Sequence, residues 1–456
     1  PIVVGDTIAF KGTLRVDALG APYISAYELI PNVGIYTQPG VKPAYIGLDV
    51  MVVGVGAPAT IAGVPQASTS EMRVEGFTTD PSMFVDIYTV DKDPATGREI
   101  DRFQGAVTAN GFTKAGAGTL TLQQPMFTIG THFINEGTLL LNGSADNTLV
   151  VNPTASGIGL QAVTINGGSL DLNGRNQAVG VLASNNTLPG AGGIVTNSSG
   201  TAAVFTTSGT GTFGGSITGN LAFTRSGNTT TTLVSSNTYI GETTIRGGVL
   251  QLLNAGAIAP ASGTPGINNY FGTLNMDFSG LTTYNTTNRV ADDLPIGLRG
   301  ATLTLTGAPG LLTTESVGAV TLLGGANSGG FNAINATAGN TGTASLTLAS
   351  LTRQTGAIVN FTGTNLGLNN YANAGVQGNG NIFITSNPTL TNNIIGGWAV
   401  VNGLDFATYN VNAGVGGLGT GGYFANYDGV LLPAASQAAY NIKLSAAAAV
   451  PAIPYQ

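Results

Sequence analysis

From about residue 107 onward, the chain repeats a short alternating pattern of apolar and polar positions. The unit is Gly or Ala, then Thr, Ser or an aliphatic residue, then apolar–polar–apolar or a close variant. Copies begin at Gly118, Gly137, Gly168, Gly248, Gly272, Ala301, Ala344 and Ala357. Two apolar side chains spaced two residues apart point to the same face of a strand. Each copy therefore predicts a short strand with one buried face.

These units commonly recur every ~20–30 residues, a period typical of solenoid proteins. Turn-forming pairs such as Asn142-Gly143 and Asn166-Gly167 punctuate them. A short strand with a single apolar face cannot bury that face alone, whereas stacking successive coils joins the faces into one interior. The pattern predicts an elongated parallel β-solenoid over residues 107–430.

Residues 1–106 have a different texture. They hold 19 charged side chains, whereas the following 350 residues hold 18. Thr7–Val16 alternates like a half-buried strand, and Ala44–Val55 is nearly continuously apolar. Met83–Val90 and Arg98–Phe103 flank a turn-rich segment and predict a hairpin. We expect a small N-terminal β domain here, either a sandwich or a barrel.

Composition excludes several classes of protein. The chain is 42% apolar and only 8% charged, which is the reverse of a disordered segment. Its net charge of −7 and scattered basic residues argue against nucleic-acid binding, which requires clustered Lys and Arg. The absence of cysteine removes disulfides and thiolate sites. No apolar run approaches the ~20 residues of a membrane helix, so we expect no embedding in a membrane.

Two segments carry a family resemblance. Phe213–Gly219 followed by Asn237–Leu252 resembles the autotransporter-associated β-strand repeat, and Lys114–Leu122 with Gly137–Leu141 is a looser second copy. The resemblance implies a secreted right-handed parallel β-helix on the exterior of a Gram-negative-type bacterium. The chain lacks the C-terminal membrane barrel of that family and begins at Pro1, so we expect a processed form, a fragment or another export route.

Candidate catalytic chemistry is sparse. His132 is the only histidine, and we interpret it as a partly exposed strand or loop residue. The adjacent pair Asp292-Asp293, and Glu242 with Arg246, are interpreted as solvating charges. Because polysaccharide-cleaving β-helices need clustered carboxylates, we expect no enzymatic activity, no catalytic residue and no cofactor.

One calcium site is a candidate. Asp91, Asp93 and Glu99 could gather around Ca²⁺, which favours several oxygen ligands. Their spacing fits no calcium-loop pattern, so a solvated acidic hairpin is the favoured interpretation.

The C-terminal part contains a candidate ligand or assembly surface made of aromatic residues: Trp398, Phe406, Tyr409, Tyr423, Phe424 and Tyr427. Aromatic rings can stack on sugars, and they can also fill the end of a solenoid core. Residues 431–456 form an apolar tail, which we expect to dock on its own chain or on a neighbouring one.

The sequence predicts a non-enzymatic, self-assembling subunit of an extracellular fibre or surface layer. Exposed strand edges at the solenoid ends, the N-terminal domain and the tail would join copies into a homopolymer. The alternatives are a cell-surface adhesin with a solenoid stalk, binding surface glycans, and a carbohydrate-active β-helix enzyme.

Overall fold

The computed structural model describes strand segments between residues 52 and 115. It then describes residues 118–123, 126–128, 131–143, 145–150, 152–154, 157–159, 161–259, 265–281, 288–325, 330–368, 378–431, 433 and 437–444. The chain divides into two compact units. Unit 1 is Pro1–Thr244 with Gly248–Leu250 and Ala255–Thr264, and unit 2 is Ile245–Gly247, Gln251–Asn254 and Pro265–Gln456.

The described residues are all-β, without a helix. It follows that none of them forms a long apolar helix able to cross a membrane.

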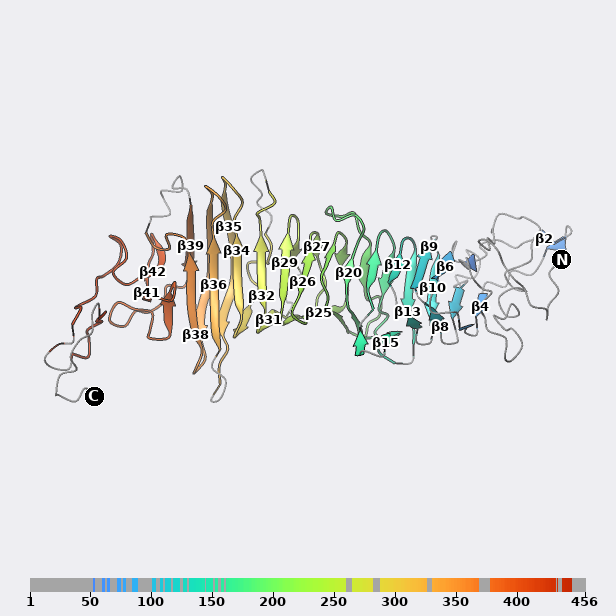
Figure 1. The fold of residues 1–456 in the computed structure, drawn as a ribbon, viewed down its shortest axis with the longest axis horizontal. Coiled ribbons are helices and arrows are strands. Elements are labelled where there is room, and N and C mark those ends of the chain that lie inside the picture. Colours follow the sequence, from blue (N-terminus) through green and yellow to red (C-terminus); the bar gives the residue numbers. More distant parts are fainter. Residues whose placement is uncertain are drawn as a thin grey trace. The chain divides into compact units, whose positions relative to one another are not determined.

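Unit 1 is built mainly from parallel sheets, which the chain visits in rotation (Figure 1). The first contains β1 (Val52–Val53), β6 (Phe84–Tyr88), β9 (Gly111–Ala115), β12 (His132–Ile134), β17 (Val163–Ile165) and β20 (Leu182–Ala183). The second contains β4 (Met72–Val74), β7 (Asp101–Phe103), β10 (Thr119–Leu122), β13 (Thr138–Leu141), β18 (Ser169–Asp171), β21 (Ile194–Thr196) and β24 (Ser216–Ile217). The third contains β5 (Phe77–Thr78), β8 (Val107–Ala109), β11 (Met126–Thr128) and β14 (Leu149–Val150).

The later part of unit 1 continues in the same manner. Parallel neighbours there are β19 (Gln177–Val179) with β22 (Ala203–Thr207) and β25 (Leu221–Ser226), β23 (Gly211–Phe213) with β26 (Thr230–Leu233), and β27 (Ser236–Asn237) with β30 (Ala257–Ile258). Two antiparallel pairs interrupt the pattern: β2 (Thr60–Ile61) with β3 (Val64–Pro65), and β15 (Asn152–Thr154) with β16 (Gly157–Gly159). β28 (Thr243–Arg246) and β29 (Val249–Leu253) contribute residues to both units.

Apolar residues in register form the interior of unit 1. Leu120, Leu139, Leu170, Val195 and Ile217 occupy one continuous row across β10, β13, β18, β21 and β24. All five are fully buried. Burying an aliphatic side chain of this kind contributes about 1.5–3 kcal/mol, so the row stabilises each strand through its neighbours.

Part of the predicted N-terminal domain is described. β4 and β7 pair in parallel with each other, and β7 pairs with β10. The hairpin predicted around residues 91–97 is wrong, because β6 pairs with β1 and β9 while β7 lies in a different sheet. The remainder of residues 1–106 lies outside the described residues, and a separate sandwich or barrel there stays a prediction.

Unit 2 contains two larger sheets of longer strands. One holds β31 (Ile267–Tyr270), β33 (Ile296–Arg299), β35 (Leu312–Leu322), β37 (Thr343–Arg353) and β39 (Asn379–Ile384). The other holds β32 (Thr273–Asp277), β34 (Thr302–Thr306), β36 (Phe331–Thr337), β38 (Ile358–Gly363), β40 (Ala399–Val401), β41 (Asp405–Asn410) and β42 (Gly414–Gly417). Strands pair in parallel as far as β40, after which β41 and β42 pair antiparallel.

The core of unit 2 follows the same rule. Leu274, Leu303, Ile334, Phe361 and Val401 lie in one registered row. The apolar pairs predicted from the repeat are confirmed as core residues throughout, from Leu120 and Leu122 to Val359 and Phe361.

Candidate functional site

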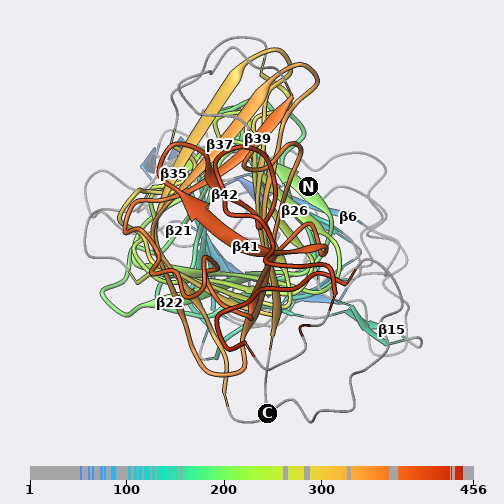
Figure 2. The same ribbon diagram turned by 90° about the vertical axis from the view of Figure 1, so that its left-hand side faces the viewer.

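The C-terminal strands of unit 2 close a sheet edge with a tyrosine. β39 is the last strand of its sheet. The Tyr409 hydroxyl donates to the Ile384 carbonyl at 2.8 Å and accepts from the Ile384 N–H at 3.2 Å. A side chain thus satisfies the two backbone groups that another strand would otherwise pair. Figure 2 shows β41, which carries Tyr409, crossing in front of the parallel strands.

A cluster of Asp405, Tyr427 and Lys443 holds the segment after β42 against β41. The Asp405 carboxylate accepts from the Tyr427 hydroxyl at 3.1 Å and from the Lys443 ammonium. The hydrogen bond to Asp405 raises the pKa of Lys443, while burial raises the pKa of Tyr427. The cluster is partly exposed, so solvent screens it and its contribution to stability is small.

The described part of the predicted tail docks on its own chain. The Asn392 amide donates to the Ala438 carbonyl at 3.0 Å, and the Asn441 amide donates to the Asn392 carbonyl. The Asn441 N–H donates to Asp428 at 2.8 Å. Residues 445–456 lie outside the described part of the chain.

The six candidate aromatic residues serve different purposes. Phe424 packs against Gly416 and Gly367, where an added Cβ would lie only 2.3 Å and 2.7 Å from ring atoms. Tyr427 accepts a hydrogen bond from the Phe406 N–H at 3.4 Å. Tyr423 is exposed. With Tyr409, the side chains of Phe424 and Tyr427 hold the closing segment together. Trp398 instead precedes β40 on the outer side of its sheet, beside the guanidinium of Arg353 at 5.4 Å.

Sequence reasoning missed other apolar residues that share the register of Trp398. Phe331 pairs with Ile358, and Val359 donates its N–H to the Trp398 carbonyl at 2.9 Å. Phe271, in the corner before β32, donates its N–H to the Arg299 carbonyl at 3.0 Å, which places it beside Gly300. Continuing the registers of β32, β34, β36, β38 and β40 gives the corner row: Phe271, Gly300, Phe331, Ile358 and Trp398. In the sequence, the signal for this row would have been large apolar residues at the corresponding corner position of successive repeats.

Four positions further along each strand from the corner row, the same strands present polar side chains outward. Asn275, Thr304, Asn335 and Thr362 form a registered row. Asn335 donates to Thr304 at 3.2 Å and accepts from the Thr362 hydroxyl. These bonds between neighbouring strands fix the side chains into an ordered hydroxyl and amide surface.

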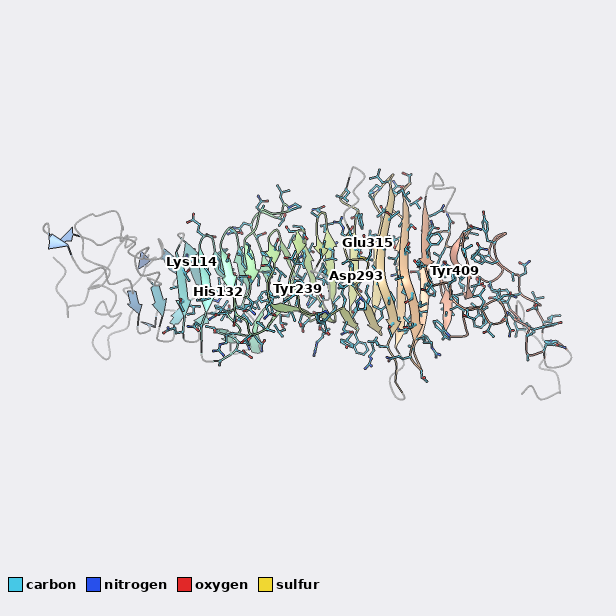
Figure 3. All side chains as sticks on the ribbon, turned by 180° about the vertical axis from the view of Figure 1, so that it is seen from behind. Lys114, His132, Tyr239, Asp293, Glu315 and Tyr409 are labelled. Carbon is cyan, nitrogen blue, oxygen red and sulfur yellow. The ribbon has the colours of Figure 1, made fainter. Side chains whose placement is uncertain are left out.

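Unit 2 also buries an ionisable pair that the sequence did not mark as buried. Glu315 accepts the N–H groups of Arg289 at 2.8 Å and Val290 at 2.9 Å (Figure 3 labels Glu315). The Arg289 guanidinium stacks on Phe278, 4.0 Å from the ring centroid. Burial raises the pKa of Glu315 to about 8 and lowers that of Arg289 to about 10. The pair holds the loop before β33 against β35.

His132 differs from its interpretation as a partly exposed residue. It is fully buried on β12, because it shares the inward parity of Ile134. Burial lowers the pKa of its imidazole to about 4, so the ring is neutral at physiological pH. Lys114, which pairs with Ile134, is also buried and donates to the Glu136 carbonyl at 3.0 Å (Figure 3).

The other candidate residues take separate positions. Asp292 is exposed and accepts from Asn288 at 2.8 Å, while Glu242 accepts from Thr244 at 2.7 Å. The calcium candidates Asp91 and Asp93 and the nearby Glu99 lie outside the described residues. Within the described ranges, no group of three or more His, Cys, Asp or Glu side chains could hold a metal ion.

Comparison with known proteins gives no relative. No family model, curated protein or solved structure matches the chain.

Proposed function

We propose that this chain is a non-enzymatic structural protein of the bacterial cell exterior, built on a right-handed parallel β-solenoid. The observation that carries the proposal is the in-register burial of aliphatic rows in each unit, such as Leu274, Leu303, Ile334 and Phe361. In such an architecture, each coil is stabilised chiefly by its neighbours. This stacked architecture is best suited to a protein that must be long and durable.

The described ionisable groups in the interior support the same proposal. Glu315 accepts hydrogen bonds from two backbone N–H groups, and Lys114 donates to a backbone carbonyl. Buried polar groups cost free energy unless they are paired, and these contacts provide that pairing within the fold. Their arrangement favours a structural role for these groups over a catalytic one.

The structural protein would act either as a subunit of a fibre or layer or as a displayed adhesin, and one observation bears on the choice between these two forms. A fibre or layer subunit would join copies through strand edges, whereas an adhesin would display an isolated solenoid. Tyr409 occupies the backbone groups of Ile384 at the β39 edge, and Lys443 fastens the following segment to Asp405. Closed edges discourage pairing between chains. This end of unit 2 therefore favours the displayed solenoid, and polymerisation would use other surfaces.

Negative-stain electron microscopy of the purified chain over a concentration series tests both modes. Elongated particles that stay single at every concentration support a displayed solenoid. Regular filaments or sheets support the self-assembling subunit. Compact globular particles would contradict the structural proposal in either form.

A further inference from the structure

The corner row of unit 2 exposes large apolar side chains to solvent. Phe271 is 72% exposed, Phe331 is 58% exposed and Ile358 is 41% exposed. They come from successive or alternate coils and lie in register with Trp398. Single exposed apolar residues are common on protein surfaces, but an aligned series marks an interaction site.

Phe271 occupies a corner whose backbone conformation strains a phenylalanine. Its φ is +60°, in the left-handed region that bulky residues rarely adopt. The equivalent corner one coil later is Gly300, also at positive φ, where an added Cβ would lie 2.8 Å from the Phe271 ring. The corner would accept Gly or Asn with less strain. A ring that is both strained and exposed indicates selection for contact with something outside the fold.

The spacing of the aromatic rings is regular. Phe271, Phe331 and Trp398 occupy every second coil, with Gly300 and Ile358 between them. Neighbouring parallel strands lie ~4.8 Å apart, so the backbone positions that carry successive rings are about 10 Å apart and the series spans about 19 Å. In a ribbon-like β-linked polysaccharide, alternate sugars present the same face, and the length of a disaccharide is comparable with this interval.

Further along the same strands, the outer face carries groups that suit sugar hydroxyls. Asn275, Thr304, Asn335 and Thr362 form the ordered polar row, and the outward side chains of β34, β36, β38 and β40 are uncharged. Two charged groups border this face: Asp277 at the end of β32, whose carboxylate accepts a hydrogen bond from Gln251, and the Arg353 guanidinium beside Trp398. Aromatic faces contact the apolar C–H faces of sugars, while hydroxyl and amide groups pair with sugar oxygens. The row is one side chain wide, and the neighbouring outward positions are Thr273, Thr302, Ala333, Asn360 and Val400, three of them polar. An interface with another protein would require a broader apolar patch.

We infer that the outer face of β32, β34, β36, β38 and β40 binds an extended, uncharged, ribbon-like polysaccharide, with Phe271, Phe331 and Trp398 as stacking platforms. The inference goes beyond the structural role and does not depend on whether copies assemble.

The single tryptophan provides a direct assay. Trp398 emission is recorded while cellohexaose or chitohexaose is added to the isolated chain, with glucose as the monosaccharide control. We expect a saturable spectral change with at least one hexasaccharide and none with glucose. Retention of the chain on microcrystalline cellulose or chitin should follow the same preference.

Variants remote from Trp398 then separate binding from folding. Phe331→Ala and Phe271→Asn should each weaken hexasaccharide binding roughly tenfold, because each removes one stacking surface. Phe271→Asn should also leave the melting temperature unchanged or raise it, since Asn tolerates the left-handed conformation. Leu404→Ala, at a residue that is 75% exposed outside the row, is the matched control and should bind normally.

Beyond any effect on self-association, four results would overturn the inference. In the first, neither hexasaccharide gives a response and the insoluble polymers do not retain the chain. In the second, glucose gives a response equal to that of the hexasaccharides. In the third, neither Phe variant affects binding, and in the fourth, the Phe271→Asn chain loses stability along with binding. If the same variants instead abolish self-association in sedimentation experiments, the face joins copies of this chain and the polysaccharide inference is wrong.

Discussion

Removing the Tyr409 hydroxyl tests the closure of the β39 edge. Tyr409→Phe keeps the ring and its packing but deletes the oxygen that bonds both backbone groups of Ile384, at 2.8 Å and 3.2 Å. Each such hydrogen bond contributes about 0.5–1.5 kcal/mol net, so two of them predict a loss of about 1–3 kcal/mol. The free energy of unfolding is measured by urea denaturation, and hydrogen exchange should show faster exchange of the Ile384 amide.

Tyr440→Phe is the matched control, because it deletes the same atom from a ring that is 50% exposed. A surface substitution of this kind should change stability by less than ~0.5 kcal/mol. If the two variants lose equal stability, or if exchange near Ile384 is unaltered in Tyr409→Phe, the edge is not closed by this hydroxyl. A rise in self-association of Tyr409→Phe alone would further link closure to the displayed state.

Three further predictions concern the core and its buried ionisable groups. Leu303→Ala should cost about 2–5 kcal/mol in chemical denaturation, because it leaves a cavity in a fully buried row, whereas the outward Thr273→Ala should cost less than ~0.5 kcal/mol. The single His132 imidazole should titrate in NMR with a pKa of about 4, and its contribution to stability should be lost as pH falls from 6.5 towards that value; a pKa near 6.5 would contradict its burial. Glu315 has a folded pKa of about 8, above its ordinary value of 4.5, so its contribution is present below pH 4.5 and lost as pH rises through 8. Glu315→Gln keeps an acceptor for the N–H groups and should flatten that slope in stability measured against pH; an unchanged slope would refute the assignment.

The alternation of the repeats predicted the core strands well. Leu120 with Leu122 and Leu303 with Leu305 are buried as expected, because the two-residue period of a strand assigns faces locally. The predicted hairpin at residues 91–97 failed, since turn-forming residues also occur where a chain turns a corner between sheets. Local sequence cannot tell a turn that reverses a strand from one that passes to the next sheet.

The residues of the candidate sites come together only through the register of strands that are far apart in the sequence. Phe271 and Trp398 are separated by more than a hundred residues, and only the register of five strands aligns them. Glu315 and Arg289 lie on different coils, and the inward direction of Glu315 follows from the strand that its neighbours form. Nothing in the local sequence marked these two residues as buried, and backbone N–H groups inside the fold replace water around the Glu315 carboxyl group.

The stacking of coils in register is the central claim, and the cysteine-free chain allows a direct test by crosslinking. Thr304 and Asn335 are registered neighbours on β34 and β36, and Thr362 lies one coil further on β38. Neighbouring strands lie ~4.8 Å apart, within the Cα separation that a disulfide spans, whereas two coils are about 10 Å apart and exceed it. Mild oxidation should therefore close an intramolecular disulfide in Thr304→Cys/Asn335→Cys and none in Thr304→Cys/Thr362→Cys. Equal crosslinking of the two pairs, or crosslinking of the second pair alone, would contradict the stacked solenoid.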